Sequence, residues 1–281
     1  MIGSFRASIV SALLVLLLAG PVQARTWAFR AGAAGTLRAL LDRVADGDTI
    51  NVEGVVKEGV LTIDRPVCLI GRKDAVIDGG GVGEVMIITA PDVTIQGLII
   101  RGTRISNLND NAAIKVKECA RTTIRGNRLL GCFFAIYLSG SKGAVVEDNE
   151  IRGDQVEENQ MANGIHLWKC SGAMIRGNTI QYHRDGIYFE FVTDSRIEGN
   201  TSRFNMRYGL HFMFSHRDGY THNLFENNGA GVAVMFSHDI DMHHNRFVSN
   251  RGGSAYGLLL KEINDGLITD NVFTDNTTGL L

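Results

Sequence analysis

The residues of this chain best suited to chemistry are methionines and histidines that recur at a fixed spacing. Several segments share the pattern Gly-apolar-x-apolar-x, and the x side chains of such a strand point away from the apolar ones. His211 and Met213 hold the two x positions of one segment, and Met235 holds the second x position of the next. Thioether sulfur selects soft ions, above all Cu(I), and imidazole binds copper or zinc. The pattern predicts a metal site formed by these three residues.

Three further residues are secondary candidates for this site. Met206 lies three residues before the glycine of its segment, a position that soft side chains also hold in the two preceding segments. His216 and His238 are one repeat apart and are expected to stack on each other. Taken singly, each methionine is also explained by gap-filling in an apolar surface, and each histidine by an ordinary surface or core position. The metal hypothesis therefore depends on the set.

The same face supports a different class of function, because aromatic side chains also lie on it. Tyr137, Trp168 and Tyr188 hold x positions, and rows of such rings stack on sugars. Glycoside hydrolysis needs two carboxylates, and lyase or epimerase chemistry needs a base facing an acid. Glu190 is the only carboxylate at the centre of the face, and the pattern pairs no acidic cluster with it. A polysaccharide lyase or epimerase that acts on an acidic polysaccharide through Glu190 is the alternative. A metal-free docking module that uses the aromatic column is a third possibility.

An asparagine that closes one strand in each repeat identifies the scaffold. The steps between successive asparagines are 22, 29, 22, 23, 22 and 26 residues, and a glycine column follows the same period. A strand-and-turn period of 22 to 23 residues is typical of a coil that stacks each rung on the last. We predict an all-β fold, a right-handed single-stranded parallel β-helix. The repeating asparagines are Asn127, Asn149, Asn178, Asn200, Asn223, Asn245 and Asn271.

The two ends of the chain differ in character. Residues 1–24 combine Arg6, an apolar run and a small residue at Ala24, which predicts a cleavable export signal. Residues 25–281 form the expected β-helix domain, in which leucines at helical spacing over 36–45 predict a helix that caps the coil. The last strand begins at Gly279 without a cap, so the natural protein is expected to be longer.

The charge balance excludes one class of partner, and the cysteine spacing predicts the state of the thiols. One of the 28 Lys and Arg residues lies in the signal, which leaves 27 against 30 acidic residues and argues against nucleic acid as a partner. The longest repeat step holds an acidic loop (residues 154–158), which is expected to flank the outward face. Cys119 and Cys170 share a turn position two rungs, about 9.6 Å, apart, beyond the reach of a disulfide, so free thiols are expected.

The stretch from Asn163 to Phe236 resembles the NosD family, β-helix proteins of the nitrous oxide reductase maturation system. Its most specific segments are YGLHFMFSH and GVAVMFSH. The resemblance implies a periplasmic, non-enzymatic protein that joins the permease and ATP-binding subunits of an ABC transporter and reaches the membrane through the permease. It also implies copper as a transient cargo, taken from a donor chaperone and supplied to apo nitrous oxide reductase for its copper-sulfur centre. In the alternative of a metal-free docking module, the reductase is the protein that the module would bind. The family offers no catalytic motif to transfer.

Overall fold

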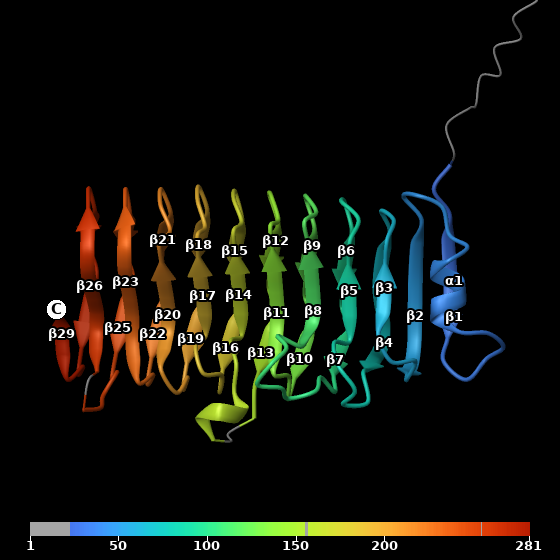
Figure 1. Ribbon diagram of the computed structural model, residues 1–281, viewed down its shortest axis with the longest axis horizontal. Coiled ribbons are helices and arrows are strands. Elements are labelled where there is room, and N and C mark those ends of the chain that lie inside the picture. Colours follow the sequence, from blue (N-terminus) through green and yellow to red (C-terminus); the bar gives the residue numbers. More distant parts are fainter. Residues whose placement is uncertain (1–22, 155–156, 254) are drawn as a thin grey trace, which may run out of the picture.

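A computed structural model describes residues 23–154, 157–253 and 255–281, and these form an elongated right-handed parallel β-helix (Figure 1). The described strands make a 19-stranded and a 10-stranded sheet, and the named ladders are parallel throughout, as between β17 (Ile187–Glu190) and β20 (Tyr208–Met213). One rung contributes β17, β18 (Arg196–Glu198) and β19 (Thr201–Arg203) before the chain enters the next rung. The predicted fold class is confirmed.

The strands stack in three runs, one on each face of the coil. The 10-stranded sheet contains β3 (Leu61–Ile63), β5 (Met86–Ile88), β8 (Ala112–Lys117), β11 (Phe134–Ser139), β14 (Ile165–Trp168), β17, β20, β23 (Ala230–His238), β26 (Tyr256–Asn264) and β29 (Thr278–Leu280). One run of the larger sheet contains β6 (Thr94–Gln96), β9 (Thr123–Arg125), β12 (Val145–Glu147), β15 (Met174–Arg176), β18, β21 (Gly219–Thr221), β24 (Asp241–His243) and β27 (Leu267–Thr269). The other contains β7 (Ile99–Arg101), β10 (Arg128–Leu130), β13 (Glu150–Arg152), β16 (Thr179–Gln181), β19, β22 (Leu224–Glu226), β25 (Arg246–Val248) and β28 (Val272–Thr274). The two runs meet at the N-terminal strands β1 (Thr26–Arg30), β2 (Thr49–Val56) and β4 (Cys68–Asp78).

The core is a set of apolar columns that run along the inside of the coil. Side chains alternate between the two faces of a strand, so each short strand points its middle or alternate residues inward. One inward column is fully buried, with every member at 0% exposure, and continues through six successive rungs. Its members are Ile124, Val146, Ile175, Ile197, Tyr220 and Met242.

Asparagine ladders fix the turns between rungs. The Nδ2 group of Asn200 donates to Oδ1 of Asn223 at 3.0 Å and to the carbonyl oxygen of Ile175 at 2.9 Å. The backbone N–H of Asn200 also donates to Asn223 Oδ1 at 2.9 Å, and the same arrangement recurs from rung to rung. A second buried ladder, which sequence reasoning missed, joins Asn205, Asn228 and Asn250. Buried backbone groups that the turns would leave unpaired are thereby satisfied.

The N-terminal end of the coil carries a short helix, α1 (Leu37–Leu41), as expected from the leucine spacing. It is shorter than the predicted span of 36–45, because the helix ends at Asp42 and the chain turns toward β2. Thr36 caps it by accepting a hydrogen bond from the Ala39 N–H. The predicted export signal lies almost wholly outside the described residues. Among those residues no helix is long and apolar enough to span a bilayer.

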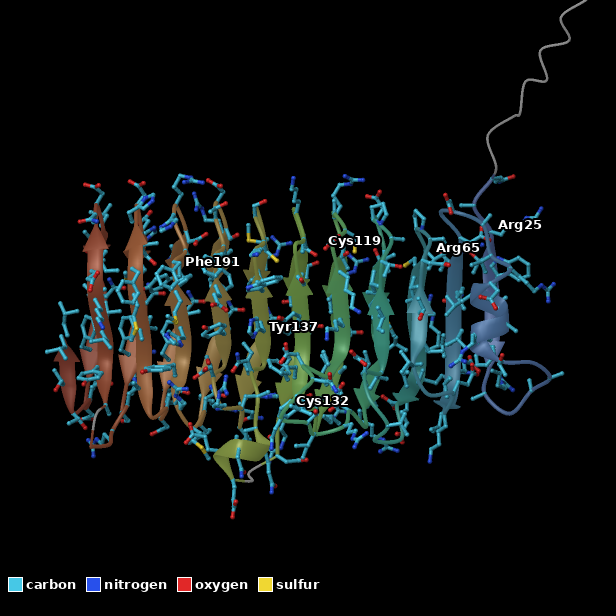
Figure 2. All side chains as sticks on the ribbon, viewed as in Figure 1. Arg25, Arg65, Cys119, Cys132, Tyr137 and Phe191 are labelled. Atoms are coloured by element: carbon cyan, nitrogen blue, oxygen red, sulfur yellow. The ribbon has the colours of Figure 1, made fainter. Side chains whose placement is uncertain are left out.

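All four cysteines are free thiols, which confirms the expectation for Cys119 and Cys170. Cys119, Cys132 and Cys170 are buried, at 3% to 6% exposure. Cys119 and Cys132 lie at opposite edges of the coil, with Tyr137 between them (Figure 2). The thiols therefore belong to different turns.

Candidate metal-binding face and adjacent groove

Met213 and Met235 are direct neighbours on the outward side of the 10-stranded sheet. β20 and β23 pair in parallel register, with Met213 opposite Met235. The alternate residue Phe212 points into the core and is fully buried, whereas both methionines are half-buried. Adjacent strands lie about 4.8 Å apart, so two thioether side chains leave the sheet side by side.

The residues that flank the methionine pair in its column, on the rung before and the rung after, carry opposite charges. Glu190 is the register partner of Met213, and Lys261 is the register partner of Met235. The ammonium group of Lys261 lies 5.2 Å from the ring centre of Phe236. On the other side, the hydroxyl of Tyr188 donates to the Met213 sulfur at 3.4 Å. A carboxylate and a phenol therefore border the thioethers.

His211 lies on the same side of β20 as Met213, but it is buried at 6% exposure. Its imidazole packs between the rings of Tyr188 and Tyr208, with ring centres 4.9 and 4.7 Å away. Burial lowers the pKa of His211 to about 4, so the ring is neutral near pH 7. Neither ring nitrogen has a hydrogen-bond partner. Neutral imidazole is the form that ligates metals, and this one has no competing partner.

Met206 is not brought to the methionine pair. It is 41% exposed and precedes β20, whereas Met213 ends that strand, so about 16 Å of extended chain separates the strand's two ends. Nor does Met206 share a column with His183, because the His183 N–H donates to Oδ1 of Asn205 at 3.1 Å. The extra residue in this turn shifts Met206 out of the expected alignment.

His216 and His238 stack as expected, with ring centres 3.9 Å apart and planes inclined by 11°. The backbone N–H of His238 donates to Nδ1 of His216 at 3.3 Å, and Nδ1 of His238 lies 2.8 Å from an Asp239 carboxylate oxygen. Imidazole lone pairs lie in the ring plane, so stacked rings direct them in parallel. In this arrangement the two histidines do not converge on one ion.

Three phenylalanines, two exposed and one partly buried, form a row beside the methionine pair. Phe191, Phe214 and Phe236 stack with ring centres 5.3 and 5.0 Å apart, and Phe191 lies at the upper edge of the coil in Figure 2. Each has a positive φ, between 49° and 55°, which is unusual for a bulky residue. Sequence reasoning missed this row, although the recurring Phe after each Glu or Met was its visible signal.

A groove with a volume of about 450 Å³ adjoins the other end of the face. Phe134, Tyr188 and His166 line it together with Arg184 and three carboxylates. The sequence pattern gave Glu190 no acidic companion, but the structure places two others along the same groove. The carboxylates are Asp110, Glu158 and Glu190. Asp110 comes from a distant loop, which the strand pattern could not reveal.

The column formed by the first x position of each segment, which includes Tyr137 and His166, is less accessible than the alternation predicts. Phe134 and Tyr137 are buried at 6% and 9% exposure, in a second apolar cluster with Ala112 and Ala162, against which Trp168 also packs. The ring of Tyr137 stacks on that of His166 with centres 4.5 Å apart. Much of this column is therefore a small second core, which leaves the methionines as the accessible soft donors of the face.

Among the described residues, no group of three or more His, Cys, Asp or Glu side chains is arranged to hold a metal ion. Methionine does not belong to that set of donors. The residues that fit a soft ion on the face are therefore the thioethers of Met213 and Met235, with His211 as the nearest nitrogen donor on the same strand.

Several solved structures of low sequence identity share the backbone fold of this chain. Its backbone is similar to the enzymatically active domain of bacteriophage CBA120 tailspike protein 2, with a TM-score of 0.64, 10% identity, and coverage of 89% of this chain and 44% of that one. The surface adhesin PfbA of Streptococcus pneumoniae is similar with a TM-score of 0.61, at 12% identity and with 86% of each chain covered. An exopolygalacturonase from Thermotoga maritima is similar with a TM-score of 0.53, at 11% identity and with coverage of 78% of this chain and 68% of that one.

A closer relationship appears in the sequence. Residues 147–281 match the family described as periplasmic copper-binding protein (NosD). A probable ABC transporter binding protein NosD of Pseudomonas aeruginosa is 39% identical over 131 residues, and one of Stutzerimonas stutzeri is 34% identical over 132. Each match covers 46% of this chain and 30% of the relative. The family resemblance is confirmed, and the chain spans under a third of those relatives' length.

Proposed function

We propose that this chain is a non-catalytic periplasmic protein that carries copper as cargo on Met213 and Met235. The observation that carries the proposal is the in-register pairing of these two thioethers on the outward face. Thioether sulfur prefers Cu(I), and two sulfurs on adjacent strands are close enough to share one ion. The carboxylate of Glu190 beside Met213 favours a positive charge there.

His211 is the third donor in this proposal. Its ring is neutral, buried and without hydrogen-bond partners, so binding an ion replaces no existing bond. Met206, His216 and His238 remain secondary candidates, because Met206 lies at the far end of β20 and the stacked histidines do not converge. A site of two sulfurs and one nitrogen suits a cargo that must be released again.

The partners in this proposal follow from the family match of residues 147–281 and from the relatives' names. Those relatives are called ABC transporter binding proteins, so we expect this chain to associate with permease and ATP-binding subunits. It would receive copper from a donor chaperone and pass it to apo nitrous oxide reductase for the copper-sulfur centre. The stacked row of Phe191, Phe214 and Phe236, of which the first two are exposed, lies next to the cargo residues and offers a contact surface for transfer.

Anaerobic titration with Cu(I) against a competing chelator tests the cargo site. Replacing Met213 and Met235 together with leucine preserves their volume and removes both sulfurs. We expect Cu(I) affinity at this site to fall at least tenfold, because the thioethers are the principal donors. Met174→Leu is the matched control, since Met174 is also partly exposed but lies on another face, in β15. Unchanged affinity in the double variant would remove the pair from the site.

A carbohydrate-active enzyme is the second candidate, and the groove is the observation that favours it. Aromatic rings and three carboxylates border the groove, and the proteins of similar fold include polysaccharide enzymes. The carboxylates outnumber Arg184, so a neutral polysaccharide suits the groove better than an acidic one. The test is turnover of neutral polysaccharides by the wild type and by Glu190→Gln. Turnover that the variant loses would favour this function over copper transport.

A further inference from the structure

A cavity of about 40 Å³ adjoins the groove, with which it shares Met161 and Ala162, at the place where the turns after β10, β13 and β16 stack. Cys132, Met161 and His183 all line it. Each of the three side chains is buried, with exposures of 5%, 7% and 2%. A thiol, a thioether and an imidazole therefore share one small space, at the edge of the coil where Figure 2 places Cys132.

The register of the rungs explains how this cavity arises. The ladder continues past the strands, because Gly131 N–H donates to the Arg152 carbonyl and Gly153 N–H donates to the Gln181 carbonyl. Cys132, Asp154 and His183 therefore hold equivalent positions on three successive rungs. Asp154 is exposed and lies at the rim of the cavity, so the middle rung contributes no buried side chain between the other two. Met161, at the end of the 3-10 turn Glu158–Gln160, lines the space instead.

His183 has the protonation pattern of a metal ligand. Its Nδ1 lies 3.3 Å from the carbonyl oxygen of Ala162, which can only accept, so Nδ1 carries the hydrogen. Nε2 is then unprotonated, and it is buried without any hydrogen-bond partner. Burial also lowers the pKa of His183 to about 4, which keeps the ring neutral. A backbone carbonyl that fixes the tautomer in this way is typical of the histidines that bind metals.

Cys132 and Met161 complete a donor set that matches one kind of ion. The Cys132 sulfur lies 3.5 Å from the Leu130 carbonyl oxygen and 3.7 Å from that of Ile100. Burial, together with the carboxylate of Asp154, raises the pKa of this thiol to about 12, so it is protonated when no metal is present. Asp154 also lines the cavity, but among the described residues no three His, Cys, Asp or Glu side chains are arranged to hold an ion, so the thioether decides the class of metal. Thiolate and thioether together select Cu(I), whereas zinc sites use thiolate, imidazole and carboxylate rather than thioether.

We propose that Cys132, Met161 and His183 form a second, buried Cu(I) site. Binding forms bonds from copper to the Cys132 sulfur, the Met161 sulfur and His183 Nε2, and it releases the thiol proton to solvent without a change in oxidation state. The site is separate from the Met213 and Met235 pair on the outward face. It depends on the cavity and its donors, and it holds whether or not copper passes to a reductase.

The test is anaerobic Cu(I) titration of the mature protein, followed by the ultraviolet charge-transfer absorption of Cu(I) thiolate. The wild type is expected to develop this absorption with one equivalent of copper. Cys132→Ser should lose the absorption and bind one equivalent fewer. Cys170→Ser is the matched control, because its sulfur is equally buried and contacts the carbonyl oxygens of Leu138 and Trp168 in the same way. Absorption that persists in Cys132→Ser, or that disappears equally in Cys170→Ser, overturns the proposal.

Two further variants separate this site from the cargo site and from effects on folding. The Met213→Leu and Met235→Leu double variant should keep the thiolate absorption, so either site can fail while the other stands. Met161→Leu conserves volume and leaves Cys132 intact, which keeps the proposal testable if Cys132→Ser does not fold. X-ray absorption is measured on the copper complex of the Met213→Leu and Met235→Leu double variant, with and without the added Met161→Leu change. Copper should have two sulfur neighbours without that change and one with it. Two sulfur neighbours in the protein that carries Met161→Leu would exclude Met161 and refute the three-residue site.

Discussion

Gly186 lies so close to the backbone of Gly209 on the next rung that no side chain fits between them. A Cβ atom at Gly186 would lie 2.6 Å from the Gly209 carbonyl oxygen and 2.1 Å from Oγ of Ser202. Gly209 meets Gly231 in the same way, with a Cβ-to-oxygen distance of 2.8 Å. The glycine column of the sequence is therefore a packing requirement, which lets one coil rest directly on the next.

Gly186→Ala is expected to lower the free energy of unfolding by about 3 kcal/mol or more, because the new methyl group must displace backbone of the neighbouring rung. Urea denaturation measures the change. Gly199→Ala is the control, since nothing lies within 4 Å of its Cβ position and only its positive φ of 63° opposes a side chain. That strain should cost about 1 kcal/mol. Equal losses in the two variants would contradict the steric explanation.

Asn200→Ala is expected to destabilise the protein by about 3 kcal/mol. Its amide group donates to Ile175 and Asn223, and its Oδ1 accepts from the backbone and side chain of Asn178. Alanine leaves these buried groups unpaired, at about 1 kcal/mol for each bond. Thermal and urea unfolding measure the loss, with Asn159→Ala as the exposed control that should change little. A loss below 1 kcal/mol for Asn200→Ala would mean that water replaces the ladder.

The fold was predictable because its determinants repeat in the sequence. Asn200 and Gly186 each recur at the rung period, so one pattern reveals the stacking, the inward column and the register of Met213 on Met235. The secondary ligands were harder to place. Met206 is out of alignment because its turn has one extra residue. The spacing in the sequence does not show which residue of the turn is the additional one.

The surroundings of the site could not be read from the strand pattern. Alternation places His211 on the outward side correctly, but it cannot show that the ring of Tyr208 covers it. Asp110 reaches the groove beside Glu190 from a loop outside the repeat. The Cys132 cavity exists where Asp154, an exposed residue at its rim, holds the position of a buried side chain on one rung. Loops and departures from the repeat therefore determine the chemistry, while the repeat determines the scaffold.

Stability is expected to fall as pH rises from about 4 to 8 through the contribution of Asp218. This carboxyl is 1% exposed, its Oδ1 accepts from the Ser195 N–H at 2.8 Å, and its Oδ2 has no partner. Burial raises its pKa to about 8, so over this pH range the folded state holds a proton that the unfolded state releases. A higher folded-state pKa gives stability that is present at low pH and lost as the carboxyl ionises, at up to about 1.4 kcal/mol per pH unit.

Asp218→Asn tests this contribution because it keeps the shape and cannot ionise. The variant should gain stability over the wild type at pH 8 and show a smaller difference at pH 5, as measured by urea denaturation at both values. Asp194→Asn is the control, since the pKa of Asp194 is lowered to about 2 by its exposed pairing with Arg217, and this variant should not become more stable at pH 8. The same difference between Asp218→Asn and the wild type at both pH values would show that ionisation of Asp218 is not responsible.

His211→Leu is expected to stabilise the protein and weaken Cu(I) binding at the same time. Both ring nitrogens are buried without partners, and removing such groups should gain about 1 to 2 kcal/mol. Because the unpaired ring lowers stability, a ligand role beside Met213 explains its presence at this position. The gain in unfolding free energy should therefore accompany a lower Cu(I) affinity in the chelator competition. His243→Leu, a partly exposed histidine on another face, should change neither quantity. Stabilisation with unchanged affinity would assign His211 to packing between Tyr188 and Tyr208, and destabilisation would mean that its nitrogens are satisfied.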